Sequence, residues 1–230
     1  MKISPRFVVL VALFVTCLIT ANVIAVKLVS FGFFVVPAAI FVFPISYIFG
    51  DVLTEVYGYA QARRVIWLGF FCNLVFVFFA WLGQIMPPAS FWTSQQSYIA
   101  ILGYAPRLLL ASFAGYLVGE FVNSYILSRL KVLTRGRWLW TRTIGSTIFG
   151  EGVDCLVFYP VAFLKVPGAL GGDWPIDVVV KIAALSWVFK VAVEVLFTPV
   201  TYLVVNVLKK AEREDYYDHN TDFNPFTLAD

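Results

Sequence analysis

The chain has 230 residues, of which 60% are hydrophobic, 18% aromatic and only 13% charged. An ordinary soluble domain has roughly 25% charged residues, so this composition excludes a water-soluble globular protein. The net charge of +3 does not indicate nucleic-acid binding, because the basic residues stand in short loops between apolar runs, where they mark membrane orientation.

Apolar runs of about 20 residues are long enough to cross a hydrocarbon core of about 30 Å as helices. The sequence contains six, which we predict at residues 7–29, 33–56, 65–86, 104–127, 143–164 and 178–208. The first is longer than the apolar part of a secretory signal and is predicted to be a retained helix. The predicted fold class is therefore an all-α integral membrane protein, with a six-helix transmembrane domain over residues 1–208 and a polar, mobile cytoplasmic tail over residues 209–230.

An uncharged stretch, residues 89–103, follows Pro87 and Pro88 at the end of the third run. Its composition suits a loop or an interfacial half-helix anchored by Trp92 and Tyr98. Three runs precede this stretch and three follow it, so two related halves would have inverted topology, as in many transporters.

The positions of lysine and arginine predict the orientation, because cytoplasmic loops are enriched in them. Most of these residues fall at the N-terminus, in the loops after the second and fourth runs, and at the C-terminus. They are Lys2, Arg6, Arg63, Arg64, Arg129, Lys131, Arg135, Arg137, Arg142, Lys209, Lys210 and Arg213. Only an even number of spans places all four groups on one side, so we expect six helices with both ends in the cytoplasm.

Several charged residues lie inside the apolar runs, where each costs about 2.5–3.5 kcal/mol and usually faces a cavity, a partner or a pathway. Three pairs are spaced so that both members share one helical face. These pairs are Asp51 with Glu55, Glu151 with Asp154, and Lys190 with Glu194, and the fourth run adds Glu120 and Asn123.

Structural explanations compete with a binding role for two of these pairs. Lys190 and Glu194 can neutralise each other within one helix, or Lys190 can serve carboxylates across the bundle. Asp51 and Glu55 can lie in the headgroup region beside the arginines that follow, or face the interior. Glu151 and Asp154 lie deeper, and with a lysine and aromatic rings nearby they suit a small, planar, polar solute rather than a lipid.

Two further patterns have simple structural explanations. Ala111, Gly115 and Gly119 form a stripe of small residues that lets helices approach closely, either within the chain or at a homodimer seam. The three cysteines lie in apolar runs without metal-ligand spacing, so we interpret them as small buried hydrophobic residues and expect no metal and no cofactor.

The charged and aromatic residues occur in blocks that together resemble the queuosine precursor transporter family, which is similar to vitamin uptake transporters. The blocks cover most of the chain from about residue 43 to about residue 202. They are Phe43-Pro44, Asp51 to Gly58 and Ala62-Arg63-Arg64; Arg107, Ala111-Ser112-Phe113 and Tyr116; Ser146-Thr147, Gly150, Asp154 and Ala162-Phe163; and Phe189-Lys190 with Pro199.

The resemblance implies a six-helix carrier in the plasma membrane, the inner membrane of a bacterium, that imports 7-deazaguanine bases or queuine for tRNA modification. A deazaguanine presents two adjacent N–H donors that one carboxylate can accept, and an oxygen that accepts a hydrogen bond. We expect Asp154 or Glu151 to take the donor edge, and Lys190, Ser146 or Asn22 to lie near the acceptor, with an aromatic ring stacked on the base. Asp51, Glu55 and Glu194 are further substrate-binding candidates, and the family pattern allows other residues at Glu55 and Glu151.

Two other functions are weighed against a transporter. An intramembrane enzyme is disfavoured because the sequence shows no Ser/His dyad or metal triad, and its single histidine, His219, lies in the polar tail. A substrate-capturing subunit of an ATP-driven vitamin-type importer remains the alternative, since the chain has no phosphate-binding loop of its own and would need an ATPase partner. The expected partners are a nucleobase and the lipid bilayer.

Overall fold

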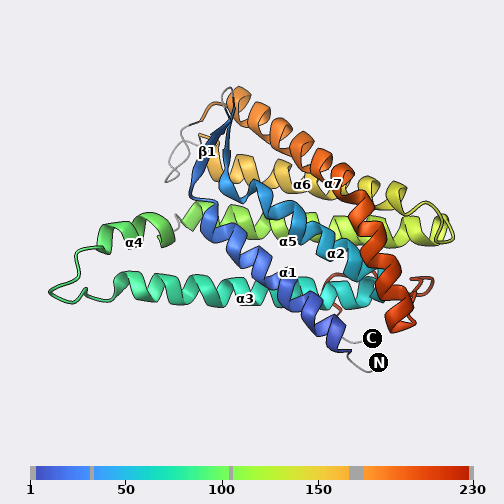
Figure 1. The fold of residues 1–230 in the computed structure, drawn as a ribbon. Coiled ribbons are helices and arrows are strands. Elements are labelled where there is room, and N and C mark those ends of the chain that lie inside the picture. Colours follow the sequence, from blue (N-terminus) through green and yellow to red (C-terminus); the bar gives the residue numbers. More distant parts are fainter. Residues whose placement is uncertain (1–3, 32–33, 104–105, 166–173, 228–230) are drawn as a thin grey trace.

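The computed structural model describes residues 4–31, 34–103, 106–165 and 174–227, and of these the side chains of residues 28, 31, 34–36 and 106–109 are not described. The described residues form a bundle of long helices with one short β-hairpin (Figure 1). In chain order the elements are α1 (Pro5–Ile24), β1 (Leu28–Phe31), β2 (Phe34–Pro37), the 3₁₀ helix η1 (Ala38–Phe41), α2 (Phe43–Tyr57), α3 (Tyr59–Ile85), α4 (Gln95–Leu102), α5 (Pro106–Leu133), α6 (Leu139–Phe163) and α7 (Ile176–Glu212). The helical class predicted from the sequence is confirmed.

Four stretches of the described chain are long and apolar enough to cross a membrane. They are Pro5–Ile24, Ala38–Tyr57, Tyr59–Ile85 and Ile176–Glu212. The other two long helices, α5 and α6, have 28 and 25 residues, which at 1.5 Å per residue give about 40 Å, enough to span the hydrocarbon core. Neither helix is among the four apolar stretches, so the count of six spans stays a prediction for α5 and α6.

The segment between the first two helices differs from the prediction. Helix α1 ends at Ile24, and an antiparallel hairpin follows in which Val29 pairs with Val36. The predicted second helix begins only at Phe43, after the turn of η1. The apolar composition of this segment suits a strand as well as a membrane helix, and its valines favour the strand because β-branched side chains pack well on a pleated surface.

The junction of α2 and α3 depends on Gly58, which has a φ of 84°. This is the left-handed region that glycine adopts without steric cost. The backbone N–H of Tyr59, the first residue of α3, donates to both carboxylate oxygens of Asp218 at 3.1 Å. The carboxylate satisfies an orphan donor at the helix N-terminus, so the tail caps α3.

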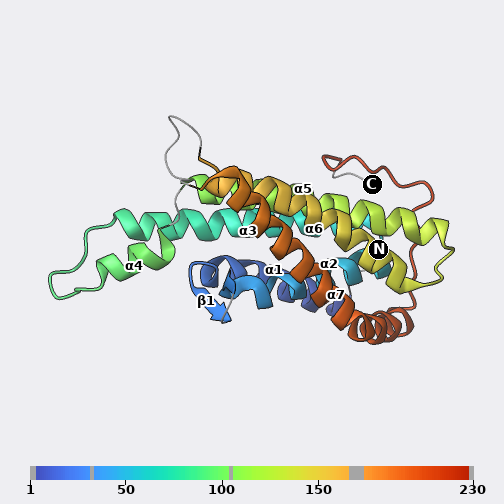
Figure 2. The ribbon, with the colours of Figure 1, turned by 90° about the horizontal axis from the view of Figure 1, so that it is seen from above.

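The polar tail is packed against the bundle, and the prediction that it is mobile is wrong for residues 213–227. Figure 2 shows the tail turning back from the end of α7 towards α5. Arg63 of α3 donates to the backbone carbonyls of Asp222 and Asn224 at 2.7 and 2.8 Å, and Trp67 donates to the carbonyl of Pro225 at 2.8 Å. Polar composition gave no sign of this docking, because the tail is held largely through its backbone.

The small-residue stripe on α5 packs against α6 of the same chain. A Cβ atom added at Gly119 would lie 2.8 Å from the Cβ of Asp154 and 3.1 Å from the carbonyl oxygen of Gly150. A Cβ atom added at Gly115 would lie 3.2 Å from the Cβ of Phe158. The two helices run side by side along most of their length (Figures 1 and 2). This part of the stripe is therefore filled within the chain and is not open to a second copy.

Basic residues from several helices meet at one end of the bundle. Arg6, at the start of α1, donates to Glu212, at the end of α7, at 3.2 Å. Lys131 near the end of α5 and Arg142 near the start of α6 both lie within salt-bridge distance of Glu55, near the end of α2. The four basic groups in the sequence thus share one end of the molecule, which we call the basic end.

We predict that Gly119→Ala destabilises the protein by about 1–3 kcal/mol, because the new methyl group must push α6 away from α5. Gly152→Ala on α6 is the matched control. Its methyl group would meet Trp187 at an ordinary distance of 3.4 Å, and alanine is the better helix former. Thermal unfolding in detergent measures both variants, and equal midpoints for the two would contradict the close packing described here.

Candidate functional site

A cavity of about 120 Å³ lies inside the bundle, with room for several water molecules and hence for a small solute. Every long helix contributes to its wall. The lining includes Asn22 of α1, Phe43, Ser46 and Tyr47 of α2, Asn73 of α3, Ser112, Phe113 and Tyr116 of α5, Asp154, Phe158 and Tyr159 of α6, and Ser186 and Lys190 of α7.

One side of the cavity carries charge. The ammonium of Lys190 lies 2.5 Å from Glu151 Oε2 and 2.6 Å from Asp154 Oδ2. The Asp154 side chain is 16% exposed, whereas that of Glu151 is 1% exposed. Asp154 therefore faces the cavity, and Glu151 holds the lysine from behind. Lys190 therefore pairs with two carboxylates of α6, across the bundle, and not with Glu194 of its own helix.

Aromatic rings surround the charged side. The Lys190 ammonium lies 5.4 Å from the ring centre of Phe43 and 6.0 Å from that of Tyr47, within the range of a cation–π contact. The hydroxyl of Tyr159 is hydrogen-bonded to that of Ser186 at 2.6 Å. Flat apolar faces next to a buried ion pair suit a planar heterocycle that can stack and form hydrogen bonds.

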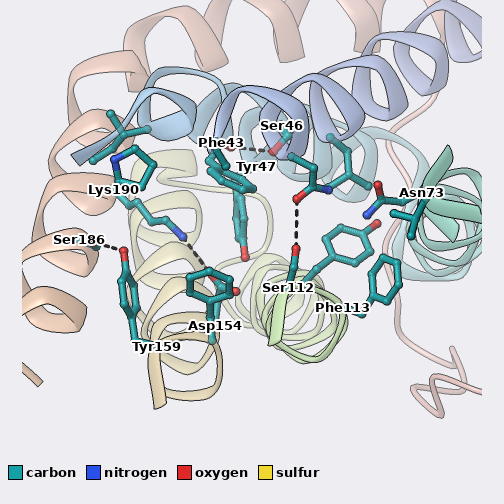
Figure 3. A pocket seen from close by; sticks show the side chains of 18 residues that line it. Phe43, Ser46, Tyr47, Asn73, Ser112, Phe113, Asp154, Tyr159, Ser186 and Lys190 are labelled. Carbon is teal, nitrogen blue, oxygen red and sulfur yellow. Dashed lines mark hydrogen bonds and ion pairs between the residues drawn. The ribbon is translucent and has the colours of Figure 1, made fainter. Parts of the chain in front are cut away.

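The opposite side of the cavity carries amides and hydroxyls. Figure 3 shows Asp154 and Lys190 on one side, Ser112 and Asn73 on the other, and Phe43 and Tyr47 between them. Ser112 donates to Asn22 Oδ1 at 3.1 Å. Asn73 is 3% exposed, and its Oδ1 has no hydrogen-bond partner among the described residues. A buried amide oxygen left in this way is available to a ligand donor.

Sequence reasoning singled out three of the lining residues as binding candidates, Asn22, Asp154 and Lys190, and a fourth candidate, Glu151, which contacts Lys190. It missed Asn73, Tyr47 and Ser112. For Asn73 a signal exists, because it is an amide in the middle of an otherwise apolar run, where unsatisfied polar groups are costly. Tyr47 carried no such signal, and Ser112 stood out only as a member of a block that resembles the family.

The remaining candidates do not line the cavity. Ser146 donates its hydroxyl to the carbonyl of Thr143 in its own helix at 2.9 Å. Asp51, 0% exposed, accepts a hydrogen bond from Asn123 at 2.6 Å. Glu194 is 1% exposed and lies one helical turn beyond Lys190.

Glu55 is the centre of an ion-pair network at the basic end. Arg142 donates to its two carboxylate oxygens at 2.7 and 2.8 Å, a bidentate geometry that is among the strongest for charged hydrogen bonds. Lys209 donates to the same carboxylate at 2.5 Å. The Glu55 side chain is fully buried, so the interpretation of this residue as a solvated headgroup contact is wrong.

The tail completes this network through Asp215, which lies 2.6 Å from Lys131 and 2.8 Å from Lys209. Burial raises the pKa of the Asp215 carboxyl, but hydrogen bonds from the two lysines outweigh burial and hold the pKa below its ordinary value. The network joins α2, α5, α6, α7 and the tail, and it lies at the basic end of the bundle.

Apolar helices of membrane-spanning length that enclose a small cavity with charged and aromatic walls are consistent with a membrane transporter. The chain belongs to the family of putative vitamin uptake transporters, whose profile matches residues 37–204. This match confirms the family resemblance seen in the sequence.

Curated relatives agree with this assignment. The chain is 32% identical to the probable queuosine precursor transporter of Bacillus subtilis (strain 168) over 164 residues, which are 71% of this chain and 69% of that protein. It is 27% identical to the queuosine precursor transporter of Escherichia coli (strain K12) over 175 residues, 74% of this chain and 73% of that protein. No solved structure is significantly similar to the chain.

We predict that Glu55→Ala lowers the thermal midpoint by roughly 10 °C, because removing one partner of a buried ion pair costs about 3–5 kcal/mol. Arg6→Ala is the control, since it breaks an ion pair whose arginine is 57% exposed, and such pairs contribute less than about 1 kcal/mol. A Glu55→Ala protein with an unchanged midpoint and no substrate binding would instead assign Glu55 to the binding site.

Proposed function

We propose that the chain imports 7-deazaguanine precursors of queuosine across the bacterial plasma membrane, with six spans and both ends in the cytoplasm. The observation that carries this proposal is the pairing of Asp154 and Lys190 on an aromatic cavity wall. Two relatives that this chain covers by about 70% are named for the transport of queuosine precursors, which supports the choice of substrate.

The cavity chemistry matches the edge of a deazaguanine. The N1–H and the 2-amino group are adjacent donors, and a carboxylate can accept both because each oxygen has two lone pairs. Asp154 presents such a carboxylate to the cavity, and Lys190 beside it can donate to the O6 acceptor. Phe43, Tyr47 and Phe158 line the space where the ring system would lie.

The side of the cavity opposite Asp154 and Lys190 can contact the rest of the base. The free Oδ1 of Asn73 can accept a hydrogen bond from the pyrrole N–H or from an aminomethyl substituent. Asn22 and Ser112, already joined to each other, define the polar limit of the cavity. A base bound in this way spans from a charged group on one side to an amide on the other, which accounts for contributions from all six long helices.

Asp154→Asn and Lys190→Met are each predicted to reduce binding of the cyano-bearing 7-deazaguanine at least about 100-fold. The asparagine amide cannot accept both donors of the base, and loss of the lysine leaves Glu151 and Asp154 buried without a counter-charge. Ser146→Ala is the control, since its hydroxyl is satisfied within α6. Titration of the purified proteins by tryptophan fluorescence or calorimetry measures the affinities. Normal binding by both charge variants would move the substrate away from this cavity.

Asn73→Leu is predicted to weaken binding about tenfold, the effect of losing one buried hydrogen bond, while the fold is retained. The loss should be greater for the aminomethyl-bearing base than for the cyano-bearing base, because only the former carries an added donor. An equal loss for the two bases would show that Asn73 contacts the ring and not the substituent.

Uptake into proteoliposomes that contain only this chain tests sufficiency. Exchange of labelled base without any ATPase supports a self-sufficient carrier. Tight binding without any exchange would favour the alternative, a substrate-capturing subunit that depends on an ATP-driven partner.

A further inference from the structure

Three buried carboxyl groups form a layer next to the cavity, on its side towards the basic end. Each stands four residues beyond a cavity-lining residue on a helix that runs towards the basic end, and is therefore one helical turn deeper. Asp51 follows Tyr47 on α2, Glu120 follows Tyr116 on α5, and Glu194 follows Lys190 on α7. None is more than 1% exposed.

Contacts tie this layer together. Asn123 of α5 donates to Asp51 Oδ1 at 2.6 Å. A Cβ atom added at Gly50 would lie 3.0 Å from Glu120 Oε2, so the Glu120 carboxyl abuts the backbone of α2 beside Asp51. Glu194 and Glu120 both lie close enough to Asp51 to interact with it electrostatically.

These carboxyl groups lack the partners that buried charges need. Both oxygens of Glu120, one of Glu194 and one of Asp51 have no hydrogen-bond partner within the described chain. The ammonium of Lys190, which interacts electrostatically with Glu120, is held by Glu151 and Asp154. A buried carboxylate without a counter-charge is so costly that the group takes up a proton instead.

A metal ion fits this layer less well than a proton. An ion needs several ligand atoms that converge on one point. Within the described residues, the group of three carboxylate or thiol ligands whose atoms lie within 4.8 Å of one another is Glu151, Asp154 and Cys155. Asp51, Glu120 and Glu194 are not such a group, and two of the converging carboxylates already hold Lys190.

We propose that Asp51, Glu120 and Glu194 form a proton-binding site, distinct from the substrate cavity, that couples proton entry to the import of the base. This inference rests on the proposed function. The charged and titratable side chains that interact electrostatically with members of the site are Tyr47 and Glu55 of α2, Tyr116 of α5, Glu151 and Asp154 of α6, and Lys190 of α7.

Coupling follows from the spacing of Lys190 and Glu194. While Glu194 is protonated, Lys190 stays with Glu151 and Asp154 and completes the substrate site. When the proton leaves towards the cytoplasm, the carboxylate of Glu194 stands four residues from Lys190 on the same helix, a spacing at which the two attract each other. The lysine then turns to Glu194, which disrupts the substrate site and releases the base.

The experiment uses the full chain in proteoliposomes and labelled cyano-bearing 7-deazaguanine. Exchange between equal concentrations of base inside and outside measures the carrier without net proton flow. Accumulation is then measured with the outside more acidic by about one pH unit, which should raise it about tenfold per coupled proton. Glu120→Gln, which mimics the protonated carboxyl, is predicted to bind and exchange the base while losing the acid-driven accumulation.

Glu194→Gln is the second variant, in case Glu120→Gln fails to fold. It is predicted to bind the base but to lose the acid-driven accumulation, because its side chain cannot become the carboxylate that draws Lys190 away. Asp177→Asn, at an exposed position near the start of α7, is the control and should keep both activities. Wild-type exchange without any effect of the gradient would overturn the proton site and leave the proposed function intact. Full acid-driven accumulation by both glutamine variants would also overturn it. Absence of wild-type exchange would overturn the transport function itself, and the coupling proposal with it.

Discussion

The position of one ammonium group, that of Lys190 between Glu151 and Asp154, organises the centre of this protein. In an interior of low dielectric the two carboxylates cannot both remain charged without it, and the lysine cannot remain charged without them. The pairing fixes α7 against α6. The small residues of α5 in turn allow α6 close enough for Gly115 and Gly119 to contact the Asp154 region. A packing feature thus places the charged wall of the cavity.

Three groups of polar residues follow one another along the axis of the bundle, and each is proposed to have a different role. The cavity and its aromatic wall lie nearer the hairpin end, a layer of unpartnered carboxyl groups lies one turn deeper, and the Glu55 network with the docked tail closes the basic end. Glu55 has Arg142, Lys131 and Lys209 as partners, whereas Glu120 has no partner among the described residues. A fully paired buried charge stabilises the structure, whereas an unpaired one takes up a proton or a ligand. Glu55 and Glu120 therefore have different roles, although both are buried glutamates of one bundle.

The sequence allowed the long helices, the shared side of the basic groups and the pairing of Lys190 with carboxylates across the bundle to be predicted, because apolar length, loop charge and buried charge are local properties of the chain. It did not reveal the β1–β2 hairpin, because valine-rich segments suit a strand and a membrane helix alike. Spacing placed Asp51 and Glu55 on one face but could not show that only Glu55 meets Arg142, which is distant in sequence. The docked tail was missed because backbone carbonyls, which every sequence has, accept many of its hydrogen bonds, and because the partners of Asp215 and Asp218 are distant in sequence.

In the proposed substrate complex, the carboxylate of Asp154 accepts the 2-amino donor of a 7-deazaguanine. The most direct measurement is a double cycle of dissociation constants, with wild type and Asp154→Asn each titrated with 7-deazaguanine and with 7-deazahypoxanthine, which lacks that amino group. We predict that wild type prefers 7-deazaguanine by about 100-fold, the effect of a hydrogen bond to a buried charged group, and that the variant has little preference. An equal preference in both proteins would show that Asp154 does not read this edge of the base.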